Sequence, residues 1–230
     1  MFRGFVFRRF DRVISVNREL EQLFHRFGVS ESRIRLIYPH AISSHSFETA
    51  LPDHLARFFQ THKPAIVTVG LLEPEYELSL QIDVLGQIRE RYPSAGLAII
   101  GSGSLEAELR EKIQSKPYAE HSLLCGDVPH AITLRAIAES DLFLRTTLYD
   151  GDSISVREAL LAGTPVIATD NGMRPYGTYL IPRPDPDALR QAIEQVLAQS
   201  SPGQPRGETG ERNIEEVFEL YQELLKERMK

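Results

Sequence analysis

Two carboxylates, Asp150 and Glu158, stand eight positions apart in the part of this chain best suited to chemistry. Asp150 lies in a loop-like run with Gly151 and Asp152, whereas Glu158 stands about one turn inside an expected helix. A carboxylate at that place can accept hydrogen bonds from the vicinal hydroxyls of a ribose, as acidic residues do in other doubly wound folds. The pattern favours a nucleotide site, but a plainer interpretation stays open, in which the aspartates are loop and capping residues and Glu158 is solvated.

The start of the expected helix adds a possible anion site. The helix begins near Ser153, and the hydroxyl of that residue or the carboxylate of Asp152 can cap it. The first N–H groups of a helix lack partners within it and carry the positive end of the helix dipole. We therefore expect the N–H groups of Ser153, Ile154 and Ser155 to form a docking point for a diphosphate.

Three arginines are candidate anion ligands in the same region. Arg145 ends an expected strand, where a ligand crevice should open, Arg157 precedes Glu158, and Arg174 follows a turn at Asn171. Surface salt bridges are the alternative for each of the three.

A second glycine-rich turn follows another expected strand. Gly101 and Gly103 let the backbone approach a ligand closely, but Glu106 stands where a dinucleotide fingerprint needs a third glycine. Nicotinamide binding is disfavoured, and the turn is either structural or a ligand-lining loop. The sequence also lacks a Walker phosphate loop and a Gly-x-Ser-x-Gly elbow, and its seven histidines show no metal-ligand spacing, so we expect neither a metal nor a cofactor.

Short β-branched runs that alternate with amphipathic stretches predict the elements that must position these residues. Apolar residues recur at helical spacing around 78–88, 105–113 and 189–197. The expected strands are residues 12–16, 34–38, 65–70, 96–101, 122–125, 141–145, 165–169 and 178–181. This alternation is typical of an α/β fold with a doubly wound, Rossmann-like parallel sheet.

Composition narrows the class of protein. With 230 residues and a formal net charge of -6, the chain lacks the basic surface that general nucleic-acid binding requires. Its single cysteine, Cys125, excludes an internal disulfide framework and is expected in the core. No apolar run approaches the roughly 18 residues of a membrane span, and the aromatic, basic N-terminus lacks the features of a secretory signal, so we expect a cytoplasmic location.

Composition breaks suggest four segments. The expected divisions are a flanking piece at 1–45, a compact α/β domain at 46–199, a linker at 200–210 and a terminal helix at 211–230. The aromatic start, Phe2 to Phe10, is either a membrane-surface patch or the exposed edge of a larger domain core.

The order of these motifs over residues 65–198 resembles the C-terminal, nucleotide-sugar-binding domain of GT-B retaining glycosyltransferases, of the group 1, family-four type. The matching runs include 67–74, 98–103, 126–128 and above all 149–170. The segment before residue 45 looks like a remnant of the N-terminal acceptor domain of that family with the interdomain connection. In the family, the terminal helix packs back on that partner domain.

The resemblance implies a donor site for a nucleotide-diphosphate sugar that needs no metal. In it, Glu158 binds the ribose, backbone near Val128 holds the base, and Asp150 with residues 151–154 faces the sugar and the diphosphate. The residues expected to bind the nucleotide sugar are Gly70, Leu71, Gly101, Val128, Asp150, Gly151, Asp152, Ser153, Ile154, Arg157 and Glu158, and those expected to be catalytic are Asp150 and Arg145.

Three departures from the family pattern are visible. Asp150 replaces the usual Glu, and Leu71 and Tyr76 stand where the family has an Arg and a Lys that neutralise the departing diphosphate. Arg145 and Arg157 occupy positions that are usually apolar. We hypothesise that these two arginines compensate for the missing cations.

The resemblance therefore implies retaining hexosyl transfer in polysaccharide or glycolipid synthesis, by a chain that holds little more than the donor half. A non-catalytic donor-binding or assembly subunit, which completes a site with a separate N-terminal polypeptide, is the first alternative. A sugar-nucleotide epimerase is the second. The implied partners are a nucleotide sugar and an N-terminal GT-B domain polypeptide, without nucleic acid and with at most peripheral contact at the inner face of the membrane.

Overall fold

The computed structural model describes residues 2–16, 18–37, 48–199 and 213–229. The chain divides into two compact units, of which one is Met1–Ser43 with Glu208–Lys230 and the other is Ser44–Gly207. The expected linker at 200–210 and the histidines His40 and His45 lie outside the described residues. The C-terminal helix thus belongs to the same unit as the N-terminal segment.

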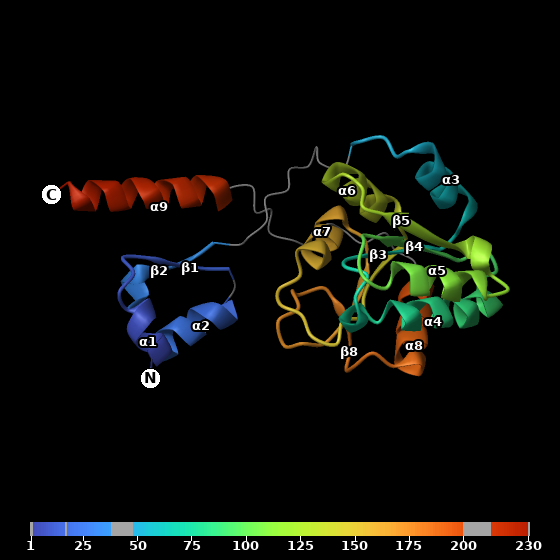
Figure 1. The fold of residues 1–230 in the computed structure, drawn as a ribbon, viewed down its shortest axis with the longest axis horizontal. Coiled ribbons are helices and arrows are strands. Elements are labelled where there is room, and N and C mark those ends of the chain that lie inside the picture. The colour runs from blue at the N-terminus through green and yellow to red at the C-terminus, as the bar shows by residue number, and fades with distance from the viewer. Residues whose placement is uncertain (1, 17, 38–47, 200–212, 230) are drawn as a thin grey trace. The chain divides into compact units, whose positions relative to one another are not determined.

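The larger unit is built on one parallel sheet of six strands (Figure 1). The strands are β3 (Ala65–Val69), β4 (Gly96–Ile100), β5 (Ser122–Gly126), β6 (Leu142–Arg145), β7 (Val166–Thr169) and β8 (Tyr179–Ile181), in the spatial order β5-β4-β3-β6-β7-β8. The predicted doubly wound parallel sheet is confirmed.

Alternation along each strand sends side chains into two separate cores, one on each face of the sheet. Ile66, Leu97 and Leu144 contribute to the core beneath α4 (Leu78–Arg91), α5 (Glu106–Gln114) and α8 (Pro186–Ala198). Val67, Ala98 and Phe143 contribute to the core beneath α3 (Asp53–Thr61), α6 (His130–Glu139) and α7 (Ile154–Ala162). Because both faces are covered, the strands are apolar at nearly every position.

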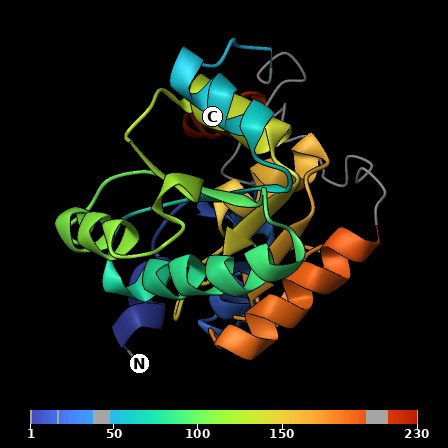
Figure 2. The ribbon, with the colours of Figure 1, turned by 90° about the vertical axis from the view of Figure 1, so that its right-hand side faces the viewer.

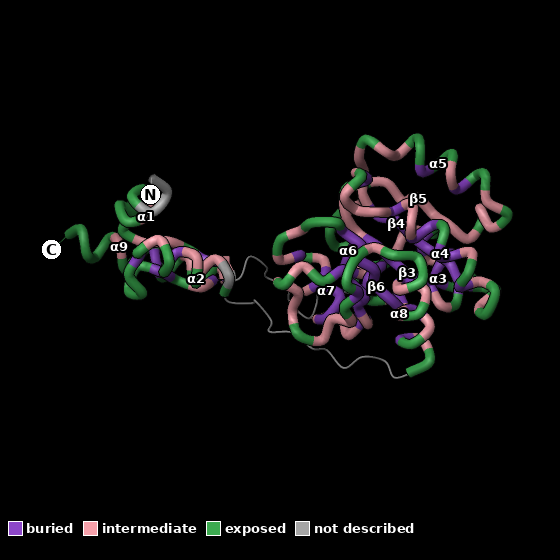
Figure 3. Tube along the Cα trace, turned by 90° about the horizontal axis from the view of Figure 1, so that it is seen from below, coloured by how far each residue is buried: buried purple, intermediate pink, exposed green. Residues whose placement is uncertain are grey.

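The helices cover the sheet in layers. Helices α4 and α8 lie side by side on one face (Figure 2). Buried positions gather along β3, β4 and β6, while the outer faces of the helices are exposed (Figure 3). Two short 3₁₀ segments, Pro74–Tyr76 and Ala119–His121, lie in the connections.

The strand order places a topological switch point between β3 and β6. From β3 the chain adds β4 and then β5 on one side, and it then crosses to the other side of β3 to form β6. The loops that leave β3 and β6 at their carboxyl ends diverge there, which opens the crevice where doubly wound folds bind ligands.

The smaller unit has a modest core. It contains α1 (Phe2–Phe7), β1 (Val13–Ser15), α2 (Arg18–Arg26), a 3₁₀ segment (Glu31–Arg33), β2 (Ile34–Leu36) and α9 (Asn213–Arg228), with β1 and β2 parallel. Phe24, Val29 and Ile34 are its buried apolar cluster.

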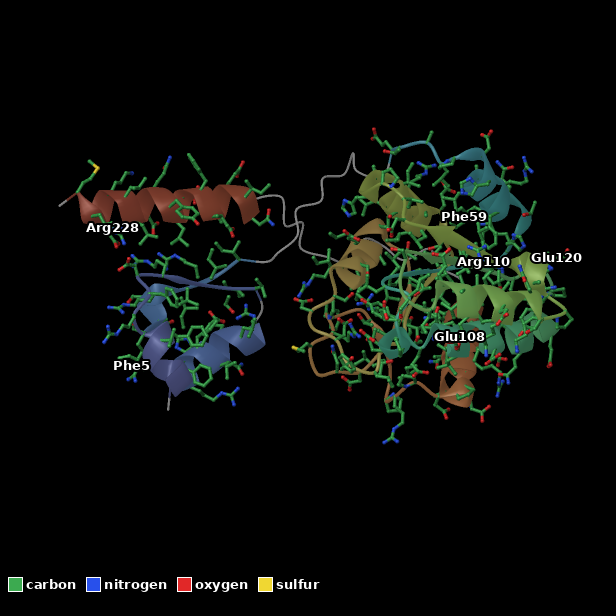
Figure 4. The ribbon with its side chains drawn as sticks, in the orientation of Figure 1. Phe5, Phe59, Glu108, Arg110, Glu120 and Arg228 are labelled. Carbon is green, nitrogen blue, oxygen red and sulfur yellow. The ribbon has the colours of Figure 1, made fainter. Side chains whose placement is uncertain are left out.

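Helix α9 contacts this unit partly through charged side chains. Its ion pairs include Arg228 with Asp11 at 3.1 Å and Glu223 with Arg35 at 3.3 Å; Figure 4 labels Arg228 on this helix. Exposed apolar side chains form a stripe along α9, at Ile214, Phe218, Tyr221 and Leu225, and Met229 directly after the helix is exposed too. Within the described ranges, no helix combines the length and the apolar character that a membrane crossing requires.

Candidate functional site at the switch point

The loops after β3 and β6 are joined by hydrogen bonds across the switch point. Arg145 donates from Nη1 to the carbonyl of Val69 at 2.9 Å, and Thr146 donates from Oγ1 to the carbonyl of Tyr76 at 2.9 Å. The N–H of Leu148 donates to the carbonyl of Glu75 at 2.8 Å. The two loops that border the crevice are thus held in one arrangement.

Glycines allow the loops after β3 and β4 to touch backbone to backbone. A Cβ on Gly101, whose φ is +133°, would lie 1.9 Å from the carbonyl oxygen of Gly70, and a Cβ on Gly70 would lie 2.1 Å from the ring of Tyr76. Gly101 also donates its N–H to the carbonyl of Gly126 at 3.0 Å. The structure therefore gives the Gly101 turn a packing reason, and its role as a ligand-lining loop stays a prediction.

Arg145 is the last residue of β6 and lies beside the carboxyl end of β3. Its side chain is only 9% exposed, and its guanidinium lies 4.6 Å from the centroid of the Tyr76 ring. The positive charge of Arg145 therefore lies beside Tyr76, the position at which the resemblance led us to expect a lysine. Nη2 of Arg145 has no hydrogen-bond partner among the described residues.

Asp150 accepts hydrogen bonds from two buried arginines. Its Oδ2 lies 2.9 Å from Nε of Arg145 and 2.9 Å from Nη1 of Arg174, while Oδ1 accepts the N–H of Gly151 at 2.9 Å. Burial raises the pKa of Asp150, but the hydrogen bond and charge of Arg145, and then those of Arg174, outweigh it and hold the pKa below its usual range. Asp150 is therefore an organising anion in this loop.

The side chain of Arg174 is buried, so it is poorly placed to bind an anion from solvent. Its side chain is 1% exposed and also donates to Thr147 Oγ1 at 2.9 Å and to the carbonyl of Thr169 at 3.0 Å. The alternative of a surface salt bridge is wrong for this residue, because its own side chain is buried. Arg174 links the loops after β6 and β7.

Asp152 pairs with Arg157 instead of capping the helix. Arg157 donates from Nε to Oδ1 at 2.8 Å and from Nη2 to Oδ2 at 2.7 Å, and the Asp152 side chain is 3% exposed. The capping prediction is wrong for both residues, since Ser153 is the N-cap of α7 without a side-chain capping bond, and its hydroxyl lies 3.2 Å from that of Ser155. The carboxylate of Asp152 thus matches the charge of Arg157.

Glu158 is buried, which excludes the interpretation as a solvated helix position. Its side chain is 5% exposed, and its Oε1 accepts a hydrogen bond from Nε2 of His130 at 2.7 Å. His130 opens α6, and its side chain is 64% exposed. Sequence reasoning missed this pair because 28 positions separate the two residues; the only signal was a histidine directly after Pro129 at a helix start.

The other predicted binding residues lie in the connections that follow β3, β5 and β6 or at the start of α7. Leu71 and Ile154 are 54% and 44% exposed, Gly151 is exposed, and Val128 is partly buried against the core beneath α6 and α7. Leu148, Tyr149 and Tyr176 are exposed apolar residues of the loops after β6 and β7.

Cys125 lies at the margin of the core beneath α6 and α7, where it is partly buried. Burial raises the pKa of its thiol to about 12, so the thiol stays protonated at neutral pH. Across the described portion of the chain, no group of three or more His, Cys, Asp or Glu side chains is arranged to hold a metal ion.

The sequence of this chain matches a known family over most of its length. The model for "Glycosyl transferases group 1" matches residues 54–216. A phosphatidylinositol N-acetylglucosaminyltransferase subunit of Arabidopsis thaliana is 23% identical over 177 residues, which cover 75% of this chain and 38% of that protein. A GDP-mannose-dependent alpha-(1-6)-phosphatidylinositol monomannoside mannosyltransferase of Mycolicibacterium smegmatis is 27% identical over 165 residues, which cover 64% of this chain and 43% of that protein.

Solved structures share the fold. The pneumococcal O-GlcNAc transferase GtfA, in complex with UDP and GlcNAc, superimposes with a TM-score of 0.68 at 20% identity, covering 97% of this chain and 47% of that one. The chain thus spans less than half the length of each of these three proteins.

Proposed function

Since the chain belongs to the glycosyl transferases group 1 family, we propose that its larger unit binds a nucleotide-diphosphate sugar in the crevice between β3 and β6. The observation that carries this proposal is the contact of Arg145 with the end of β3 and the Gly70 loop at the switch point. In the proposed site this cation, the N-terminus of α7 and the buried carboxylate of Glu158 would supply the groups that a nucleoside diphosphate needs. Relatives that are named as GDP-mannose-dependent or are bound to UDP support the choice of ligand class.

Within the site, Glu158 holds the ribose and backbone near Val128 holds the base. The N–H groups at the start of α7, with Gly151, Ser153 and Ile154, face the diphosphate and the sugar. Asp150 acts on the donor indirectly, because both of its oxygens are engaged within the loop.

Arg145 is the better of the two candidates for the missing diphosphate cation. Its Nη2 has no partner among the described side chains and main-chain groups, and it lies beside Tyr76, where the family has a lysine. Arg157, in contrast, has its charge matched by Asp152 through two hydrogen bonds. A guanidinium aimed at the leaving diphosphate would stabilise the charge that develops as the bond to the sugar breaks.

The proposed reaction is hexosyl transfer with retention, without a metal, to a glycolipid or polysaccharide acceptor. The bond between the anomeric carbon and the diphosphate breaks, a new bond forms to an acceptor oxygen, and the acceptor proton leaves with the diphosphate. The acceptor would be held mainly by an N-terminal GT-B domain. Relatives named for phosphatidylinositol derivatives favour a lipid acceptor at a membrane surface, and we propose the inner, cytoplasmic face.

A second function is suggested by the name of one relative. The phosphatidylinositol N-acetylglucosaminyltransferase protein of Arabidopsis thaliana is named as a subunit. A donor-binding or assembly subunit, which completes its site with a separate N-terminal polypeptide, would need only the larger unit described above.

Titration calorimetry with UDP-glucose, UDP-GlcNAc and GDP-mannose tests the binding proposal. We expect saturable binding of at least one donor in the presence of EDTA. The affinity should fall by about tenfold or more in Arg145→Met, because one lost charge-assisted hydrogen bond is worth roughly 1.5–3 kcal/mol. It should change little in Arg157→Ala. Failure to bind any donor would contradict the proposal. Equal losses in both variants would contradict the assignment of the cation to Arg145.

A transfer assay with a radiolabelled donor and lipid or oligosaccharide acceptors separates the two functions. Transfer by this chain alone supports the enzyme, whereas transfer only after addition of an N-terminal GT-B domain polypeptide supports the second function. Donor binding without transfer in either case would contradict the transferase proposal.

A further inference from the structure

We infer that His130 is a positioning residue that orients the carboxylate of Glu158 for a ribose. This inference rests on the proposed function, because it assumes that Glu158 binds the nucleotide. It assigns to α6 a part in nucleotide recognition that the segment 150–158 alone does not contain.

The hydrogen bond between the two side chains fixes the direction of the Glu158 carboxylate. The His130 Nε2 to Glu158 Oε1 distance of 2.7 Å is that of a charge-assisted hydrogen bond. A carboxylate only accepts, so Nε2 must carry the proton and donate it. Rotation of the Glu158 side chain away from this donor would break the bond, and the pair therefore fixes where the second oxygen, Oε2, points.

The two side chains differ greatly in exposure. Glu158 is 5% exposed, and His130 is the only residue within the described ranges whose side chain donates to its carboxylate, whereas His130 itself is 64% exposed. A buried carboxylate needs a donor to offset the cost of leaving water. His130 supplies that donor from the solvent side and leaves Oε2 available to ligand hydroxyls.

The packing of α6 against α7 brings the pair together. Helix α6 follows the edge strand β5, while α7 follows β6 on the other side of β3. The two helices contact each other, and Ala136 and Ile137 of α6 belong to the same buried core as Val156 and Ala159 of α7. This packing holds the first residue of α6 beside α7 at the carboxyl edge of the sheet, so the position of His130 is set by two packed helices.

Nucleotide analogues provide a readout that general destabilisation would not change. The probes are UDP and GDP and their 2′,3′-dideoxy counterparts, which lack both hydroxyls that Glu158 would accept from. The measured quantity is the ratio of the dissociation constants of the dideoxy and the ribose nucleotide, for the base that binds more tightly. In the wild type we expect a ratio of about 10 or more, because hydrogen bonds to a charged group are lost.

Four variants then test the role of His130. In His130→Ala we expect the ratio to fall to about 3 or less, because Glu158 loses its orientation. His130→Gln should keep the wild-type ratio, because the amide nitrogen of glutamine can donate from about the position of the histidine Nε2. His130→Asn is one methylene shorter and should behave like alanine, and it serves if the alanine variant does not fold. His54→Ala, at an exposed histidine near the start of α3, is the matched control and should leave the ratio unchanged.

The outcomes separate this inference from the function on which it rests. An unchanged ratio in His130→Ala and His130→Asn would overturn the positioning role, even if the wild type binds nucleotide and prefers ribose. A wild type that binds no nucleotide, or does not distinguish ribose from dideoxyribose, would overturn both the ribose role of Glu158 and this inference.

Discussion

The carboxylates at the two ends of the segment 150–158, Asp150 and Glu158, differ in their hydrogen-bond partners and in their burial. Asp150 accepts hydrogen bonds from Arg145, Arg174 and its neighbouring main chain, so both oxygens are engaged. Glu158 is more buried, yet within the described part of the chain its only side-chain donor is the exposed His130. A carboxylate held by two guanidinium groups organises a loop, whereas one with an unused oxygen can exchange partners with a ligand. The sequence and its family resemblance led us to expect both at the donor, with Glu158 at the ribose and Asp150 at the sugar.

Removal of the Asp150 carboxylate should have the largest effect. Asp150→Ala leaves Arg145 and Arg174 buried without their shared anion, and we expect the free energy of unfolding to fall by about 3–5 kcal/mol. Urea denaturation followed by circular dichroism measures the loss.

Asp83→Ala is the matched control for this prediction. Asp83 also lies between two cations, Lys112 and Lys116, but its side chain is 46% exposed, so we expect a loss of about 1 kcal/mol or less. Similar losses in the two variants would show that burial does not distinguish the two clusters.

Neutralisation of Glu158 should weaken nucleotide binding and leave the free energy of unfolding nearly unchanged. In Glu158→Gln the amide oxygen can still accept from His130, but the charge that attracts ribose hydroxyls is lost. We expect about tenfold weaker binding of UDP or GDP, or about 1.4 kcal/mol, with the free energy of unfolding within about 1 kcal/mol of wild type. Calorimetry and urea denaturation measure the two quantities, and Glu108→Gln, at an exposed position of α5, is the control. A large loss of stability with unchanged affinity would reverse the roles assigned to the two carboxylates.

Protonation of Asp150 should account for part of the fall in the free energy of unfolding at acid pH. Burial raises the pKa of Asp150, but Arg145 and then Arg174 together lower it by more than burial raises it. The pKa in the folded state therefore lies below that in the unfolded state. The stabilisation is complete above the usual aspartate pKa of about 3.9 and is lost as the pH falls from there through the folded pKa. Between pH 5 and pH 3 the wild type should therefore lose more stability than Asp150→Asn, as measured by urea midpoints. Parallel curves for the two proteins would contradict this assignment.

The strands of the larger unit could be predicted because the sequence patterns that specify them span only a few neighbouring residues. Each expected strand between residues 65 and 181 appears within one residue of its predicted bounds, since alternating apolar runs and turn residues act over short distances. The helix start near Ser153 was also predictable, for the same reason. The pairing of Asp152 with Arg157, in place of a cap, was not predicted, because Arg157 offers that carboxylate two hydrogen bonds instead of one.

The sequence predicted the class of fold, the family pattern, and the place of Arg145 at a strand end, of Asp150 in the loop after it and of Glu158 inside the next helix. Which groups these side chains meet depends on the tertiary structure. Arg145 lies beside Tyr76 because β3 and β6 are neighbours in the sheet, and His130 meets Glu158 because α6 and α7 pack on one face. Such pairs join residues from separate elements, so their contacts depend on how the sheet is wound and on the burial that this winding imposes.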